Sequence, residues 1–190
     1  SCPETTVASS FQLYQELGLR GEVNFPAFEQ ALKGFSRYAS GQDRLLVLID
    51  YTKPSTEKRF YILDLLQKKL LLSTYVAHGR GSGDNYAVAF SNRPGSYQSS
   101  LGFFRTGDTY MGKNGYSLFL DGLEKGINDK ARERAIVVHG ANYADPAVLK
   151  GQQRLGRSLG CPALPPDISK QVIDTIKGGV LLYIYGLNKA

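Results

Sequence analysis

Cys161 and His139 are the two residues whose types and positions suit nucleophilic catalysis. A free thiol has a pKa of about 8.5, so a cysteine nucleophile needs a base near neutral pH, and histidine is the usual partner. His139 lies near the end of the apolar run 135–140, which predicts a buried strand and therefore a rigid platform. We predict that His139 activates Cys161. The competing interpretations are a small buried cysteine and a hydrogen-bonded structural histidine.

The residues beside this pair suit acyl transfer. Gly160 allows the backbone to approach a substrate closely, so the N–H groups of Cys161 and its neighbours are candidates for an oxyanion hole. The imidazole also needs an orienting acceptor, and the carbonyl of Gly140 is the natural candidate. Ser158 is expected either to bond the substrate or to hold the loop.

Other polar side chains are candidates for the walls of the site. These are His78, Ser91, Asn92, Tyr110, Asn114 and Tyr143. His78 precedes a glycine-rich stretch and suits either a substrate contact or a structural role. The serine and the asparagines are also ordinary turn formers, and the tyrosines, Tyr116 among them, also suit packing on a sheet. Because His78 and His139 make no convincing ligand set, we expect no metal.

Hydrophobic periodicity predicts the elements that must position these residues. Two helices are expected at 7–20 and 24–41, the second capped by Asn24 and closed by Gly41. Strands are expected at 44–51, 59–66, 70–79, 101–106, 116–120, 135–140 and 180–186, and further helices at 128–134 and 167–177. Residues 79–98 form a long loop, which is uncommon in a compact domain unless it has a function. The up-and-down order of the strands favours an antiparallel sheet, and the fold class is mainly β (α+β).

Composition restricts the partners. The net charge is +6 and the isoelectric point is near 9.3, which suits an anionic partner such as a carboxylate-rich cell wall. The basic residues are scattered and no nucleic-acid motif surrounds them, so we expect no nucleic-acid partner. No apolar stretch is long enough to span a membrane. The small polar residues 1–10 resemble a stretch that follows a cleaved signal. Cys2 suits a free thiol, a disulfide with Cys161 or a lipid anchor.

The motifs together resemble the catalytic domains of L,D-transpeptidases of the YkuD type, and more closely the murein L,D-transpeptidase branch. The carrying stretches are 76–83, 90–92, 99–110, 112–143 and 156–164, which include HG at 139–140 and S-x-G-C at 158–161. The resemblance implies a YkuD-like β-sandwich or mixed-sheet catalytic domain at 42–190, preceded by a helical extension at 1–41. It also implies Cys161 as nucleophile, His139 as base and the Gly140 carbonyl as its orienter. The implied substrates are the donor and acceptor stem peptides of peptidoglycan, and the implied reaction needs no metal and no cofactor.

The resemblance further implies an exported protein of the periplasm or cell envelope, and a cysteine that carbapenems acylate. Many family members have histidine directly before Gly-Cys, where this chain has Leu159, and Arg or Asn soon after it, where this chain has Pro162 and Ala163. Other donors must then contact the substrate carboxylate. The candidates are Lys113, Arg157 and Ser158.

Three functions remain open at this point. The first is an L,D-transpeptidase that forms crosslinks through a cysteine thioester. The second is an L,D-carboxypeptidase or another stem-peptide hydrolase that uses the same residues. The third is a peptidoglycan-binding module that has kept the fold without catalysis.

Overall fold

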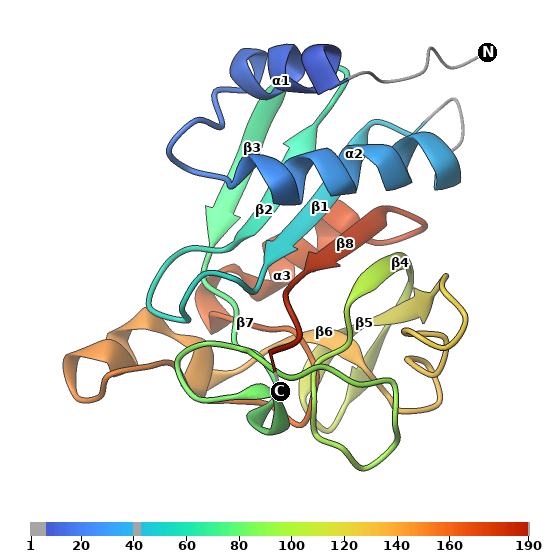
Figure 1. Ribbon diagram of the computed structural model, residues 1–190. Helices are drawn as coiled ribbons and strands as arrows, with labels where there is room; N and C mark the ends of the chain where they lie inside the picture. The colour runs from blue at the N-terminus through green and yellow to red at the C-terminus, as the bar shows by residue number, and fades with distance from the viewer. Residues whose placement is uncertain (1–6, 40–42, 190) are drawn as a thin grey trace.

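A single mixed β-sheet organises the chain (Figure 1). The computed structural model describes residues 7–39 and 43–189. The helices are α1 (Val7–Glu16), α2 (Phe25–Tyr38) and α3 (Pro166–Ile176), with short 3-10 turns η1 (Arg80–Ser82), η2 (Asn142–Ala144) and η3 (Pro146–Lys150). The strands are β1 (Leu45–Asp50), β2 (Phe60–Asp64), β3 (Lys69–Thr74), β4 (Gly102–Gly112), β5 (Gly115–Gly122), β6 (Val137–Gly140), β7 (Ala163–Leu164) and β8 (Leu181–Tyr185).

The eight strands lie in the order β3-β2-β1-β8-β4-β5-β6-β7. Two antiparallel meanders, β1-β2-β3 and β4-β5-β6, agree with the up-and-down order expected from the sequence. The sheet as a whole is mixed, however, as the family resemblance implies. β8 lies between the meanders, parallel to β1 and antiparallel to β4, and β7 runs parallel to β6. The long connections before β8 and β7 leave room for the crossovers that parallel pairs need.

The central strands are buried on both faces, and alternate side chains enter two different cores. In β1, Val47 and Ile49 belong to a core that also contains residues of α3, whereas Leu46 and Leu48 pack with residues of α1 and α2. Such strands have apolar residues at successive positions instead of an apolar–polar alternation. This explains the continuous apolar run that predicted β1.

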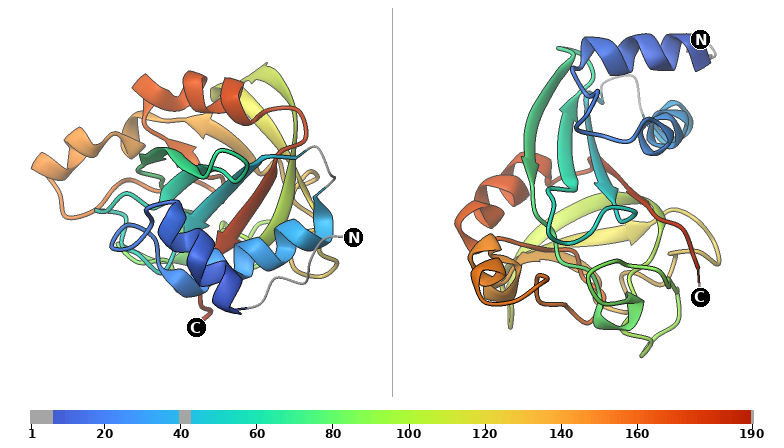
Figure 2. Two further views of the ribbon diagram at one scale, coloured as in Figure 1. Left: turned by 90° about the horizontal axis from the view of Figure 1, so that it is seen from above. Right: turned by 60° about the vertical axis from the view of Figure 1, so that its left-hand side comes forward.

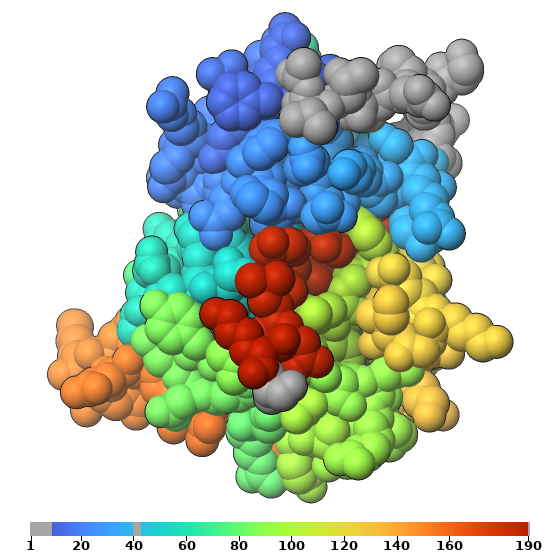
Figure 3. All heavy atoms as spheres, viewed as in Figure 1, coloured from blue at the N-terminus to red at the C-terminus, as the bar shows by residue number. Residues whose placement is uncertain are grey.

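The helices cover opposite faces of the sheet, with α1 and α2 on one side and α3 on the other (Figure 2). In the space-filling view, α1 and α2 lie over the upper part of the molecule (Figure 3). Asn24 does occupy the N-cap of α2, but its side chain donates to Asp50 Oδ2 at 2.7 Å instead of capping the helix. α1 and α2 share a core with the sheet, and the domain boundary at residue 41 stays a prediction. Cys2 and Gly41 lie outside the described residues.

The segment before β6 differs from expectation, because residues 125–135 form successive turns and not a helix. Asn128 explains the difference. Its side-chain oxygen accepts from Glu124 N–H, and its amide donates to the carbonyls of Leu101 and Phe103. The side chain therefore ties the turns to β4 instead of capping a helix. Within the described residues, none of the helices is long and apolar enough to cross a membrane.

Candidate active site

The platform of the site is the parallel pair β6–β7. His139 of β6 pairs in register with Ala163 of β7, and Cys161 comes two residues before that strand. Ala77 forms a bridge to Ala163 from the other side, so the start of the long loop is fixed to the same place. The short strand β7 therefore positions the cysteine beside the strand that carries the histidine.

His139 is held in one orientation. Its side chain is buried, and Nδ1 lies 2.9 Å from the carbonyl oxygen of Gly140. Since a carbonyl only accepts, Nδ1 must carry the proton, which leaves Nε2 as the basic nitrogen. Burial lowers the pKa of His139 and the Gly140 carbonyl opposes this shift. The imidazole is therefore neutral at neutral pH and able to accept a proton.

Cys161 is also buried, and its sulfur lies between two backbone groups. The N–H of Val137 donates to Sγ at 3.4 Å, and the thiol donates to the carbonyl of Ala135 at 3.4 Å. Burial raises the pKa of the Cys161 thiol, while the Val137 N–H and the charges of Arg134 and Lys113 lower it. In the described part of the chain, no hydrogen bond joins this sulfur to the imidazole of His139. The resting pair is a neutral thiol and a neutral imidazole.

Ser158 and Gly160 shape the loop that leads to the cysteine. Ser158 Oγ donates to the carbonyl of Cys161 at 2.6 Å and accepts from the N–H of Gly160 at 3.1 Å. Gly160 has φ +127°, a conformation that side-chain-bearing residues rarely adopt. Within residues 7–39 and 43–189, no protein acceptor takes the N–H of Cys161. That N–H is therefore available as an oxyanion donor, whereas the N–H of Gly160 is already used.

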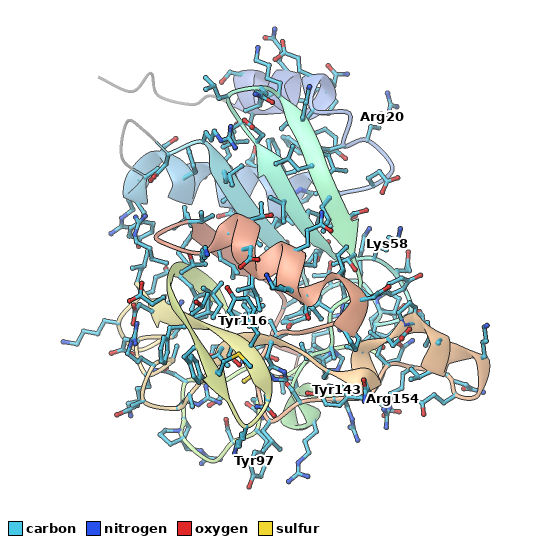
Figure 4. The ribbon with its side chains drawn as sticks, turned by 180° about the vertical axis from the view of Figure 1, so that it is seen from behind. Arg20, Lys58, Tyr97, Tyr116, Tyr143 and Arg154 are labelled. Atoms are coloured by element: carbon cyan, nitrogen blue, oxygen red, sulfur yellow. The ribbon has the colours of Figure 1, made fainter. Side chains whose placement is uncertain are left out.

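Cys161 and His139 line one pocket of about 320 Å³. Its other lining residues are Lys113, Asn114, Arg134, Ala135, Ile136, Tyr143, Arg157, Ser158 and Leu159. A neighbouring cavity of about 460 Å³ is also lined by His139 and shares Lys113, Asn114 and Tyr143 with the first pocket; Figure 4 labels Tyr143. None of the described residues that line the smaller pocket is acidic, and three are basic. The pocket is therefore suited to an anionic group.

Several residues proposed from the sequence lie elsewhere. His78 is buried outside both cavities, where its Nδ1 accepts from Arg59 and its Nε2 lies 3.3 Å from the carbonyl of Gly83. Burial and the Arg59 charge lower its pKa to about 3, so His78 is a neutral structural residue. Its position next to the glycine-rich stretch brings its backbone, not its ring, near the catalytic loop: the N–H of Ser158 donates to its carbonyl.

Ser91, Asn92 and Tyr110 are also absent from the residues that line the two cavities. Asn92 hydrogen-bonds Asp129 and accepts from Lys130 N–H, which is the behaviour of a turn former. Tyr110 stacks on Phe119 with ring centroids 4.4 Å apart, which is the expected sheet packing.

Tyr116 lines the larger cavity and donates to Asp174 of α3 at 2.5 Å (Figure 4). Arg157 lines the smaller pocket, but its Nη1 also donates to the carbonyl of Gly83 at 3.2 Å.

Sequence reasoning missed Arg134 as a residue of the site. It lines the pocket of Cys161 and donates four hydrogen bonds to residues 91–100. The neighbouring residues in the sequence give no indication of this role, because the hydrogen-bond partners of Arg134 are distant in the chain. Among the described residues there is no group of three or more acidic, histidine or cysteine side chains that could hold a metal ion.

Comparison with known proteins identifies the family of the chain. The family model for the L,D-transpeptidase catalytic domain matches residues 19–185. No curated protein matches the chain. An L,D-transpeptidase structure from Mycobacterium smegmatis is 13% identical, with 75% of this chain and 59% of that chain covered and a TM-score of 0.46. An L,D-transpeptidase from Stackebrandtia nassauensis is 14% identical, with 96% and 78% covered and a TM-score of 0.46.

The helical cell shape determining protein Pgp2 from Campylobacter jejuni is 16% identical, with 78% of this chain and 50% of that chain covered and a TM-score of 0.49. This chain therefore spans 59% of the length of the M. smegmatis protein and 50% of the length of Pgp2. The family match begins at residue 19, between α1 and α2, and includes all of α2.

Proposed function

The chain belongs to the L,D-transpeptidase catalytic-domain family, and from this premise we propose that it crosslinks peptidoglycan stem peptides through a thioester on Cys161. One observation carries the proposal. Cys161 and His139 line the same pocket, and the Gly140 carbonyl holds the imidazole in the tautomer that leaves Nε2 basic. The neutral resting pair makes His139 a general base and not a preformed imidazolium partner.

The first half-reaction transfers the donor stem to the enzyme. The thiol leaves the Ala135 carbonyl, and its proton passes to Nε2 of His139. The thiolate then attacks the carbonyl carbon of the third stem residue, and the bond from that carbon to the terminal D-alanine breaks. The departing amine takes the proton from His139, which leaves a thioester on Cys161. The free N–H of Cys161 is placed to donate to the oxyanion of the tetrahedral intermediate.

The second half-reaction releases the thioester. An amine of the acceptor stem gives up a proton to His139 and attacks the thioester carbonyl, so that an amide crosslink forms and the sulfur regains its proton. Attack by water would instead give L,D-carboxypeptidase activity. The neighbouring cavity of about 460 Å³, which His139 also lines, offers room for an acceptor, and this favours transpeptidation.

The charges of the pocket favour a donor with a free carboxylate. Arg134 and Arg157 already donate to protein carbonyls, whereas Lys113 forms no ion pair among the described residues. Lys113 is the turn residue between β4 and β5 and lines both cavities. We assign it to the C-terminal carboxylate of the donor. Such a substrate lies outside the cytoplasm, and we accordingly propose an exported protein.

Incubation of the purified protein with tetrapeptide muropeptides tests this function. A crosslinked dimer is expected, together with one released D-alanine per crosslink, and tripeptide alone would assign the hydrolase instead. Cys161→Ser and His139→Gln should each remove the product, and undiminished turnover by either variant would overturn the mechanism. Intact-mass analysis after exposure to a carbapenem should show one adduct. A folded protein whose Cys161 resists both carbapenem and iodoacetamide would point to a non-catalytic binding module.

A further inference from the structure

We propose that Arg134 is a positioning residue, which fixes the long loop beneath the cysteine and keeps a fixed positive charge beside the nucleophile. The inference rests on the proposed function, because it names a determinant of the reactivity of that same cysteine. Arg134 belongs to the turns that precede β6, which stand beside the long loop in Figure 1.

Most hydrogen-bond donors of the Arg134 guanidinium group bind acceptors in the long loop and just after it. Nη1 donates to the carbonyl of Ser91 at 3.0 Å and to Ser100 Oγ at 2.8 Å. Nη2 donates to Ser96 Oγ at 3.2 Å and to the carbonyl of Gln98 at 2.8 Å. The planar guanidinium group presents several donors in a fixed arrangement and can therefore reach four acceptors at once. The ammonium group of a lysine cannot reproduce this arrangement.

The loop that Arg134 holds packs against the residues that precede the nucleophile. The backbone of Gly160 lies against the carbonyl of Gln98, since a Cβ on Gly160 would meet that oxygen at 3.0 Å and Arg134 Nη2 at 3.5 Å. Ser99, next along the loop, accepts from the N–H of Gly79 at 2.9 Å, and Gly79 forms a bridge to Ser158. Arg134 thus fixes the surface on which residues 158–161 lie.

Arg134 also precedes the residue whose carbonyl accepts the thiol. Ala135 has φ +55°, in the left-handed region that is unfavourable for a non-glycine residue. This conformation directs the Ala135 carbonyl to the sulfur of Cys161. The hydrogen bonds of the neighbouring Arg134 side chain offset this local strain and keep the carbonyl in place.

Several other groups surround the sulfur and must be weighed against Arg134. They are Tyr51 after β1, Lys113 in the β4–β5 turn, His139 of β6, Tyr143 of η2 and Arg157 in the loop before Cys161. Of these, Lys113 also lowers the pKa of the Cys161 thiol, against the larger effect of burial. Lys113 is an exposed turn residue, whereas Arg134 is half-buried and held by four hydrogen bonds. The charge of Arg134 therefore stays in place when substrate enters.

The test measures the alkylation of Cys161 by iodoacetamide from pH 6 to 10, in a Cys2→Ser background, by intact mass. Arg134→Gln is expected to move the midpoint of the profile up by about half a pH unit or more, which slows alkylation about threefold at pH 7.5. Arg134→Lys should restore most of the midpoint but not the turnover of tetrapeptide, because a single ammonium group cannot hold four acceptors. Arg132→Gln is the matched control, since Arg132 lies in the same turns and pairs outward with Asp121.

A wild-type profile in folded Arg134→Gln would overturn the proposal, as would an equal shift in Arg132→Gln. If Arg134→Gln does not fold, Arg134→Lys decides alone: reduced turnover with a nearly normal midpoint supports the role, and full turnover refutes it. Thermal melting reports the folded fraction of every variant. Alkylation needs no peptidoglycan, so Arg134→Gln tests the inference even if the wild-type protein processes no muropeptide.

Discussion

Replacing Gly160 with alanine should damage both stability and catalysis, because no relaxed position exists for the new methyl group. At φ +127° a side-chain-bearing residue is strained by about 1–3 kcal/mol. The added Cβ would also meet Ile136 Cδ1 at 2.9 Å and the carbonyl oxygen of Gln98 at 3.0 Å. Overpacking of this kind costs about 1–3 kcal/mol. We expect the free energy of unfolding to fall by about 2–6 kcal/mol.

The catalytic effect should exceed what the lost stability explains. The strain and the clash are both relieved by moving residues 159–161, which shifts the sulfur of Cys161 relative to His139. A misplacement of about 1 Å at a reacting group costs about 100-fold in rate. Urea denaturation measures the first effect, and the rate of D-alanine release from tetrapeptide, normalised to folded protein, measures the second.

Gly151→Ala is the matched control for this substitution. Gly151 has φ −115°, and a Cβ built there meets nothing within 4 Å. Its unfolding free energy should stay the same or rise by about 0.4–1 kcal/mol. If Gly160→Ala were as stable as Gly151→Ala and released D-alanine within threefold of the wild-type rate, the close packing under the catalytic loop would be refuted.

Three further outcomes are expected. The pKa of His78 is about 3 in the folded protein and near 6.5 when unfolded, so the unfolded chain takes up the proton first as pH falls below 6.5. The unfolding free energy should therefore decrease by up to about 1.4 kcal/mol per pH unit, and His78→Gln should reduce this slope between pH 7.5 and 5.5 in urea titrations. Arg59→Met should cost about 3 kcal/mol or more, because it leaves the buried carbonyl of Val76 and His78 Nδ1 without their donor; a change below 1 kcal/mol would contradict this. Lys113→Gln should raise KM about two- to fivefold for donors with a free carboxylate, and equal KM increases for amidated donors would argue against the assigned contact.

Local pattern was sufficient to predict most of the strands and the helix α3. β1 and β8 are continuous apolar runs because both faces of these strands are covered, and α3 has its apolar residues on one face. The parallel pairing of β1 with β8 was not predictable, because it depends on which strands meet after the chain has crossed the sheet. The helix expected at 128–134 failed for a similar reason: the partners of Asn128 lie on β4.

The same distinction applies to the site. Residue type and motif brought out His139, Gly140 and Cys161, which the fold places together. Arg134 went unnoticed because its function depends on four acceptors in a loop more than thirty positions earlier. Ser91 and His78 were candidates because they lie near glycine-rich sequence. The glycines there allow tight backbone packing, and the side chains of Ser91 and His78 hydrogen-bond within that packing.

The position of β8 also determines how the molecule can be assembled. β8 (residues 181–185) is central in the sheet. It pairs with residues 46–50 on one side and with residues 102–105 on the other. Until residues 181–185 arrive, the two meanders have no strand between them, and β1 and β4 each present an unpaired, apolar edge. Contacts of such long sequence separation slow folding, and open edges favour association between chains. The chain is therefore most prone to association before β8 inserts, and the meander β4-β5-β6, which carries His139, is joined to the other meander only when β8 pairs with both.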